Sequence, residues 1–325
     1  MRVIVRRLLF YVVTAIAAVT VDFFIPRLMP GNPVEAVLAH MQGNMTPATI
    51  HSLEMQYGLN SPQGLWGQYI TFWVHLLHGN LGISTSYYPS TVTDVIRSAL
   101  PWTLGLVGVS TVISFVLGTL LGILVAWRRG TWLDNLLPAT TFFQAAPYFF
   151  VAFLALDLFA VRLGWFPTGR AYNQLDFPAW NAGYIGDVLE HAILPAFTIV
   201  LCSAAGWIVG MRNVMVTTMD EDYVLVAQAK GLAKRRVVWY AARNAILPSV
   251  SGFSLAIGFV VSGALLTEIV FSYPGLGWIL LQAVGARDYP LLQGIFLIIT
   301  FAVLIANLAA DSVYVFLDPR TRQEA

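Results

Sequence analysis

The sequence predicts an all-α membrane protein with six transmembrane helices and one long external segment after the first helix. Apolar residues make up 58% of the 325-residue chain, charged residues make up only 11%, and the apolar residues gather in long runs. An average soluble domain has about a quarter charged residues, and a helix needs about 20 mostly apolar residues to cross a bilayer. This composition excludes an ordinary soluble protein.

The first span is predicted at residues 8–25, after a short N-terminal stretch that contains three arginines. A cleaved signal peptide has a shorter apolar core and small residues at its cleavage site, whereas residues 26–33 are rich in proline. We therefore interpret residues 1–28 as an uncleaved transmembrane helix with a cytosolic N-terminus. Asp22, near the outer end, either snorkels or faces a partner helix, and a tolerated interfacial carboxylate is the simpler interpretation.

Residues 29–100 contain no run long enough to cross a bilayer and are predicted to form an extracytoplasmic segment. Within it, residues 57–62 have the composition of a turn. Residues 65–77 are rich in aromatic side chains and predict an amphipathic helix near the membrane interface. His75 and His78 have no carboxylate or cysteine nearby, so we interpret them as surface or interfacial residues rather than metal ligands.

Five further apolar runs predict the remaining spans and, with one cytosolic loop, make up a core over residues 101–316. The runs lie at about residues 101–127, 135–161, 192–216, 249–271 and 290–316. Pro138, Pro147 and Pro195 fall inside or at the ends of these runs, where membrane helices can kink. Residues 162–190 are rich in turn-forming and aromatic residues and are predicted to be external.

Positive charges predict which side of the membrane each segment occupies. Of the eighteen lysines and arginines, the five in segments placed outside are Arg27, Arg97, Arg162, Arg170 and Arg287. The other thirteen lie at or beside the segments placed inside. Since cytosolic loops carry an excess of Lys and Arg, this bias predicts cytosolic termini, a cytosolic tail at 317–325 and a cytosolic loop at 217–247.

The cytosolic loop contains both lysines of the chain and predicts a short helix. Thr218 and Glu221 have the spacing of a capping box, and the acids at 220–222 favour a helix N-terminus. Gly231 is placed to end this helix in a left-handed conformation. One helix face would be formed by Tyr223, Val226, Ala227 and Lys230. Such a face suits docking into a groove on another protein; the alternative is an ordinary loop whose basic residues only set the topology.

Several strings in the chain resemble a known family. The loop contains Asp222-Tyr-Val-Leu-Val-Ala-Gln-Ala-Lys-Gly-Leu-Ala-Lys-Arg-Arg236 and Arg243-Asn-Ala-Ile-Leu-Pro248. It resembles the "EAA" loop of bacterial ATP-binding-cassette (ABC) import permeases, in its dipeptide and oligopeptide permease form. Further matching strings are Pro30-Gly-Asn-Pro33, Tyr57-Gly-Leu59, Gly79-Asn-Leu-Gly-Ile-Ser84, Thr267-Glu-Ile-Val-Phe-Ser-Tyr-Pro-Gly-Leu-Gly277, Ala286-Arg-Asp-Tyr-Pro290 and Leu317-Asp-Pro-Arg320. The resemblance therefore runs almost end to end.

This resemblance implies a B-type permease subunit with the type I ABC importer permease fold, in a bacterial cytoplasmic membrane. A second, homologous permease would form the other half of the translocation path. Two ATPase subunits, or one two-headed ATPase, would dock on the cytosolic loops, and an extracytoplasmic peptide-binding protein would deliver the peptide. ATP and Mg²⁺ would be bound by the ATPase partners, with no cofactor in this chain.

The resemblance also implies roles for individual residues. It assigns ATPase docking, through a coupling helix, to Asp222, Tyr223, Val226, Ala227, Lys230, Gly231, Leu232 and Arg236. Candidates for a gate or pathway are Glu268, Tyr273 and Pro274, although an interfacial acid hydrogen-bonded to its own turn is the alternative for Glu268. Leu225 and Val226 stand where the acid and the first alanine of the loop's name would be, so residue roles are not transferred from sugar-type permeases.

The chain carries no recognisable catalytic or nucleotide-binding string. An ATP-binding loop ends in Gly-Lys-Ser/Thr, whereas Lys230 and Lys234 each follow an alanine. The acids within the predicted spans are scattered, at Asp22, Asp157, Glu268 and Asp311. The single cysteine, Cys202, forms no internal disulfide and is interpreted as a small packing residue. The composition indicates no nucleic-acid partner, and a membrane-embedded enzyme would need a catalytic constellation that the sequence lacks.

The sequence therefore predicts a non-catalytic permease subunit of an ATP-driven, binding-protein-dependent importer of oligopeptides or dipeptides. One alternative is the same class of importer with nickel or another small solute as cargo. A second alternative is a stand-alone ion-coupled carrier. That class would show inverted repeats or carboxylates near the middle of the bilayer, and neither is evident.

Overall fold

A computed structural model describes residues 2–28, 64–173, 181–258, 260 and 264–317, and their regular structure is helical apart from one isolated β-bridge, between Ile83 and Thr91. The chain divides into two compact units. Unit 1 comprises residues 1–101 and 275–304, and unit 2 comprises residues 102–274 and 305–325. The turn predicted at 57–62, the string at 30–33 and the tail at 318–325 lie outside the described residues.

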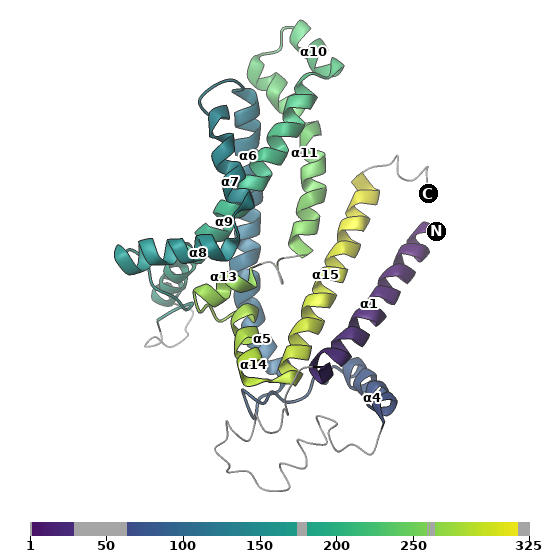
Figure 1. Cartoon of the computed structure of the whole chain (residues 1–325). Coiled ribbons are helices and arrows are strands. Elements are labelled where there is room, and N and C mark those ends of the chain that lie inside the picture. Colours follow the sequence, from purple (N-terminus) through teal and green to yellow (C-terminus); the bar gives the residue numbers. More distant parts are fainter. Residues whose placement is uncertain (1, 29–63, 174–180, 259, 261–263, 318–325) are drawn as a thin grey trace. The chain divides into compact units, whose positions relative to one another are not determined.

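Unit 1 contains the N-terminal helix and a second helix that packs against it. Its helices include α1 (Arg2–Leu28), α4 (Leu65–Leu77), most of α5 (Val92–Thr103), α14 (Leu276–Ala286) and the first part of α15 (Tyr289–Leu317) (Figure 1). The helix predicted at 65–77 is confirmed with the same bounds. The Phe23 ring lies 5.2 Å from the Tyr69 ring, and Thr20 Oγ1 lies 2.7 Å from the Tyr69 hydroxyl. The aromatic side of α4 therefore packs against α1.

Asp288 connects the segment between α4 and α5 to the start of α15. Its carboxylate is fully buried and accepts hydrogen bonds from the Ser84 hydroxyl, from Ser86 N–H at 2.9 Å and from Leu291 N–H at 3.1 Å. The last bond satisfies a backbone donor in the first turn of α15, as an N-cap does. Two of the strings that carry the family resemblance, 79–84 and 286–290, therefore meet at one carboxylate.

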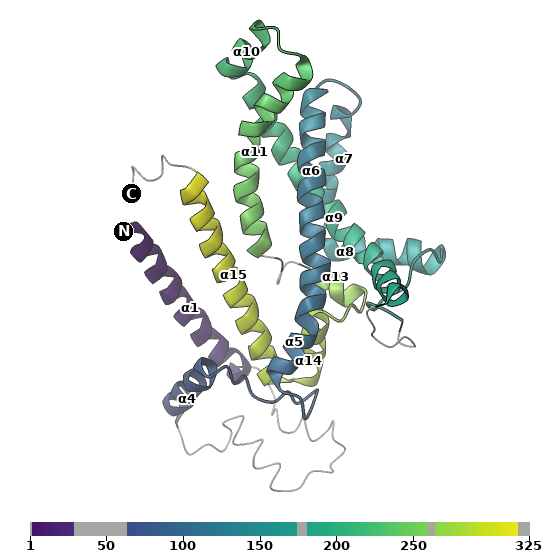
Figure 2. The same cartoon turned by 180° about the vertical axis from the view of Figure 1, so that it is seen from behind.

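Unit 2 is organised around the 38-residue helix α9 (Ala182–Met219). It packs against α6 (Val109–Trp127), α7 (Leu137–Ala145) and α11 (Lys234–Gly258), as Figure 2 shows from behind. The closest approach is to α6, where a Cβ added at Gly118 would lie 2.4 Å from Trp207 Cβ, and one at Gly122 would lie 2.8 Å from Ile208 O. These glycines are four residues apart, the spacing that lets membrane helices approach closely. This glycine pair was not among the features predicted from the sequence.

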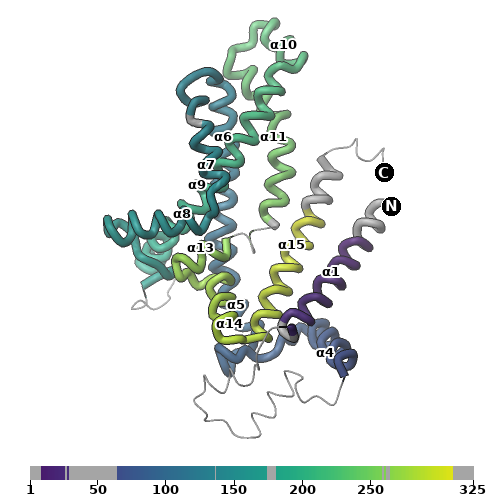
Figure 3. The backbone as a smooth tube through the Cα atoms, in the orientation of Figure 1, coloured from purple at the N-terminus to yellow at the C-terminus, as the bar shows by residue number. Residues whose placement is uncertain are grey.

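Two predicted spans differ in outline from the helices observed. Residues 92–127 form one continuous helical run with a π-helical segment at Leu104–Gly108, so this span begins at Val92 rather than near residue 101. The span predicted at 135–161 is broken into α7 and α8 (Tyr148–Ala155), which continues as a π-helical segment, and the two parts are bent by 103° (Figure 3). Pro147 lies at this break, because proline has no N–H to continue the ladder of α7.

The span predicted at 249–271 stays a prediction, because residues 259 and 261–263 within it lie outside the described residues. On either side of them the chain forms α11, which already begins at Lys234, and the short helix α13 (Leu265–Val270). The buried residues of the first half of α11 are Val237, Val238, Ala241, Ala242 and Ala245. They recur at helical spacing, so this half is amphipathic. The charged residues on its outer face interrupt the apolar sequence, so a search for uninterrupted apolar runs does not identify this half of α11.

The described residues support a multi-span helical membrane protein. Three helices are long and apolar enough to cross a bilayer, namely Val92–Trp127, Ala182–Met219 and Tyr289–Ala309, and the bent α7–α8 pair makes a fourth if it is one span. The apolar stretches Leu9–Ile25 and Leu276–Ala286 are shorter. The count of six spans stays a prediction.

Candidate functional site

The short helix predicted in the cytosolic loop is present as α10 (Asp222–Ala229). Gly231 follows it with φ of 75°, which confirms the predicted left-handed end. The predicted capping box is wrong, because Glu221 is the N-cap and makes no side-chain cap hydrogen bond. Thr218 still lies inside α9, which runs to Met219, and its hydroxyl donates to Val214 O at 2.8 Å. A threonine within a helix commonly bonds the carbonyl four residues back.

One side of α10 is packed into the end of the helical bundle of unit 2 (Figure 1). Val224 is fully buried, Ala227 is 7% exposed, and the Tyr223 ring lies 5.8 Å from the Tyr240 ring of α11. The buried cluster under α10 also includes Ile123, Ala126, Met211, Met215, Val237, Val238, Ala241, Ala242 and Ala245. Side chains of α6, α9, α10 and α11 therefore share one core, and α10 is held firmly against α9 and α11.

The other side of this segment exposes apolar side chains. Leu225 is 49% exposed, Val226 is 51% exposed and Leu232 is 37% exposed. Apolar residues that stay half-exposed beside basic ones are typical of a surface that a protein partner covers. The residues exposed around them include Asp222, Lys230, Gly231, Lys234, Arg235 and Arg236.

Burial divides the set of residues predicted to dock. Val226, Lys230, Leu232 and Arg236 are open to a partner, whereas Ala227 faces the core of unit 2. A large residue at Ala227 would therefore disturb the packing of α10 before it altered any docking surface. We call Leu225, Val226 and Leu232 the α10 apolar strip.

A second contact fixes the connection between α6 and α7 to α9. Arg212 Nη2 donates to Asp134 Oδ1 at 3.0 Å, and their side chains are 21% and 16% exposed. Gly130 N–H also donates to the Asp134 carboxylate, and this bond, followed by the charge and hydrogen bond of Arg212, lowers the pKa of Asp134. No local sequence signal pairs residues so far apart in the chain.

The candidate gate residues lie together around the end of α13. Glu268 is fully buried and Tyr273 is 3% exposed, and Tyr273 N–H donates to the Glu268 backbone carbonyl at 2.8 Å. The Tyr273 ring packs edge-on against Trp102, with 6.0 Å between ring centres, and Pro274 is half-buried. Burial places Glu268 inside unit 2 rather than on an open surface. Its role as a gate stays a prediction.

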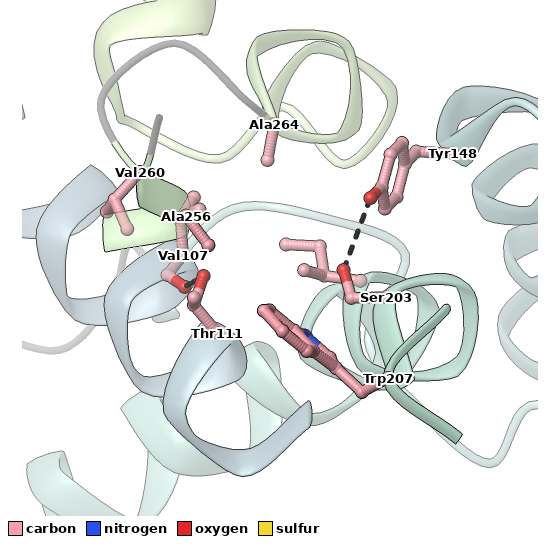
Figure 4. A pocket seen from close by; sticks show the side chains of 9 residues that line it. Val107, Thr111, Tyr148, Ser203, Trp207, Ala256, Val260 and Ala264 are labelled. Carbon is pink, nitrogen blue, oxygen red and sulfur yellow. Dashed lines mark hydrogen bonds between the residues drawn. The ribbon is translucent and has the colours of Figure 1, made fainter. Parts of the chain in front are cut away.

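A cavity of about 270 Å³ lies between helices of unit 2 (Figure 4). Its lining comes from Val107, Thr111, Tyr148, Ile199, Ser203, Trp207, Ala256, Val260 and Ala264. The Tyr148 hydroxyl and Ser203 Oγ lie 3.2 Å apart, and Thr111 Oγ1 donates to Val107 O at 2.7 Å. The lining offers hydroxyls and one indole but no charged side chain. Sequence reasoning missed this cavity because widely separated segments contribute to it.

Metal binding receives no support from the described part of the chain, in which no group of three or more His, Cys, Asp or Glu side chains is placed to hold an ion. His78 instead contacts the backbone, with Nδ1 2.7 Å from Val74 O. Cys202 is buried, as predicted for a packing residue.

The chain combines several membrane-spanning helices with a short helix that is packed into the bundle and exposes an apolar strip. These features are typical of integral membrane subunits that work with a protein partner. Residues 118–323 match the family described as binding-protein-dependent transport system inner membrane component, and the chain belongs to this family. The predicted resemblance is confirmed, and the protein is a multi-pass component of the inner membrane.

Relatives with assigned names match nearly the whole chain. A peptide permease protein of Brucella suis biovar 1 is 35% identical over 99% of both chains. The oligopeptide transport system permease protein AppB of Bacillus subtilis is 31% identical over 98% of both chains. The di/tripeptide transport system permease protein DppB of Pseudomonas aeruginosa is 31% identical over 99% of this chain and 98% of its own.

Proposed function

We propose that this chain is a permease subunit of an ATP-driven, binding-protein-dependent importer of short peptides. The observation that carries the coupling part of the proposal is the two-sided packing of α10, which buries Val224 in the bundle and leaves the α10 apolar strip open. The named relatives carry the cargo part, since they are permeases for peptides, oligopeptides or di- and tripeptides. In this proposal the chain has six spans and the type I importer permease fold.

In this proposal α10 would couple ATP hydrolysis in the partner subunits to movement of the membrane helices. ATP and Mg²⁺ would be bound by separate ATPase subunits, either two or one with two heads, and the α10 apolar strip would rest on them. Because α10 shares one core with α9 and α11, a displacement of α10 would be transmitted to both helices. Rigid-body motion of packed helices is an established way of converting a local change into a global one.

Peptide would pass between this chain and a second, homologous permease, after delivery by an extracytoplasmic binding protein. The cavity beside Tyr148 and Ser203 offers hydroxyls that can exchange hydrogen bonds with peptide amides. Its lack of charge favours passage over tight retention, because an ion pair in a site of low dielectric would hold the cargo strongly.

The test is reconstitution of this chain in vesicles with its partner permease, its ATPase subunits and its binding protein. The expected result is peptide uptake that requires ATP, the binding protein and the ATPase subunits together. Uptake by this chain alone, with or without an ion gradient, would contradict the proposal in favour of a stand-alone carrier. Uptake of nickel and not peptide would keep the importer class and overturn the cargo.

A further inference from the structure

A second pocket of unit 2, away from the hydroxyl-lined cavity, has an unusual concentration of charge. Its volume is about 520 Å³, within the range of about 300–1,000 Å³ that is typical of small-molecule sites. Its lining includes Arg170, Tyr172, Asn173, Asp187, Glu190 and His191. All of these residues lie in or beside the segment 162–190, which is predicted to be external and so faces the side from which cargo arrives.

Two of the ionisable side chains in this pocket are engaged with neighbours. Asp187 Oδ2 accepts a hydrogen bond from Asn173 N–H at 2.6 Å, and Asp187 Oδ1 lies 3.2 Å from His191 Nδ1. Their side chains are 19% and 11% exposed, so this pair forms the inner part of the pocket wall. It fixes the first turns of α9 to the preceding segment.

The other two charged groups point to a ligand of mixed charge. Within the described parts of the chain, the structure shows no hydrogen bond or ion pair for the guanidinium of Arg170 or for the carboxylate of Glu190. Both residues are exposed at the pocket. Arg170 and Glu190 thus place one positive and one negative charge on the same open pocket without pairing with each other. Such a pocket complements a molecule that carries both charges.

Arg170 is also held in a backbone conformation that residues other than glycine rarely adopt. Its φ is 72°, and its N–H donates to Phe271 O at 2.7 Å. The neighbouring Gly169 leaves no room for a side chain, because an added Cβ would lie 2.5 Å from Phe271 O, and Ala171 is 1% exposed. A strained residue that is fixed on both sides is a feature found more often at functional sites than elsewhere.

One aromatic residue of the pocket lining, Tyr172, is held in place by two further rings. Tyr172 stacks on Trp102 with ring centres 5.8 Å apart, and its ring centre lies 5.3 Å from that of Tyr184. These contacts hold the residue that lies two positions after Arg170, so the chain around the guanidinium is anchored at both ends. The pocket is therefore a preformed surface rather than a chance meeting of surface side chains.

We propose that this pocket is an external subsite for the free ends of a short peptide, with Arg170 binding the α-carboxylate and Glu190 binding the α-ammonium group. Arginine forms bidentate hydrogen bonds to carboxylates, and a carboxylate accepts charge-assisted hydrogen bonds from an ammonium group. This inference rests on the proposed function, and it assigns part of the cargo's recognition to this chain rather than to the binding protein.

The direct test measures peptide binding to the assembled complex in nanodiscs, without the binding protein. Binding is measured by titration with saturation-transfer NMR. The three probes are trialanine, N-acetyl-trialanine and trialanine amide, which differ only in their terminal charges. The wild type should bind trialanine about tenfold more tightly than either capped form, the loss expected for one charge-assisted hydrogen bond near a surface. Equal binding of the three probes by the wild type overturns the subsite.

The variants assign each end separately. Arg170→Gln should abolish the discrimination against the amide and keep that against the acetylated peptide, whereas Glu190→Gln should do the reverse. Arg170→Gly removes the charge while relieving the positive φ, so it should lose the same discrimination without losing thermal stability. The matched control is Arg162→Gln, because Arg162 is 70% exposed, pairs with Asp157 at 2.7 Å and does not line the pocket.

The proposal is overturned if Arg170→Gln and Glu190→Gln discriminate between the probes as the wild type does. It is also overturned if these variants lose the same binding affinity for all three probes. Import of trialanine by the complete wild-type system is measured in parallel. Absence of import overturns the proposed function and this subsite with it. Normal import without discrimination between the probes overturns the subsite alone.

Discussion

The α10 apolar strip allows a quantitative prediction about docking. Replacing Leu225 and Val226 by alanine removes the exposed apolar atoms without weakening the helix, since alanine has the highest helix propensity. Full burial of such a side chain contributes about 1.5–3 kcal/mol. Because the two residues are 49% and 51% exposed, a partner that covers the open half would gain about 1 kcal/mol from each.

The double variant should therefore bind the ATPase subunits about thirtyfold more weakly, which corresponds to about 2 kcal/mol. The assay is titration of ATPase subunits onto the permease pair in nanodiscs, with thermal stability measured on the same samples. Stability should stay at the wild-type level, because neither side chain belongs to the buried core.

Two further variants make this prediction specific. Val224→Ala, at a fully buried position, should lower thermal stability and docking together, because it opens a cavity under α10. Leu163→Ala is a matched surface control at 44% exposure in the segment predicted to be external, and it should change neither. Wild-type affinity in the Leu225→Ala/Val226→Ala variant would refute the reasoning.

Three other predictions concern the framework around this strip. Gly118→Ala should lower thermal stability by about 1–3 kcal/mol, because its Cβ would lie 2.4 Å from the nearest atom of α9, whereas Gly105→Ala, with no atom within 4 Å, is the control; equal effects would contradict it. Asp134→Asn should remove a pH dependence: because Gly130 N–H and Arg212 lower the pKa of Asp134, its contribution to stability is present at neutral pH and is lost as pH falls through the lowered folded-state pKa. Thermal melts of wild type and variant between pH 7 and pH 3 check this, and parallel curves would contradict it. Gly231→Val should destabilise the end of α10, since φ of 75° is disfavoured for a β-branched residue, and faster limited proteolysis between α10 and α11 is the expected readout; unchanged cleavage would argue against it.

Local rules predicted the parts of the fold that depend on neighbouring residues. The helix at 65–77 and the glycine that ends α10 were both foreseeable, because aromatic spacing and a left-handed cap leave a signature within a few residues. The capping box failed for a physical reason: Thr218 meets its spacing, but α9 continues past the point where its apolar run ends. A helix end is decided by packing as well as by propensity.

The rest of the candidate site depends on contacts that sequence spacing does not reveal. The Asp134–Arg212 pair and the hydrogen bonds to Asp288 join residues far apart in the chain. The beginning of α11 was missed because its buried residues recur at helical spacing beneath a basic surface. Only the packing of α10 shows that Ala227, which was predicted to dock, faces inward. It also shows that Leu225, which the predicted set lacked, is exposed beside Val226, which the set contained.

Site-directed crosslinking from α10 tests the account most directly. Cys202, the single native cysteine, is buried, so a cysteine introduced by Val226→Cys would be the accessible one for a short thiol-directed photocrosslinker. In vesicles that contain the complete importer, the account predicts crosslinks to the ATPase subunits and loss of ATP-dependent peptide uptake once they form. Crosslinks to the extracytoplasmic binding protein, or undiminished uptake by fully crosslinked complexes, would contradict it.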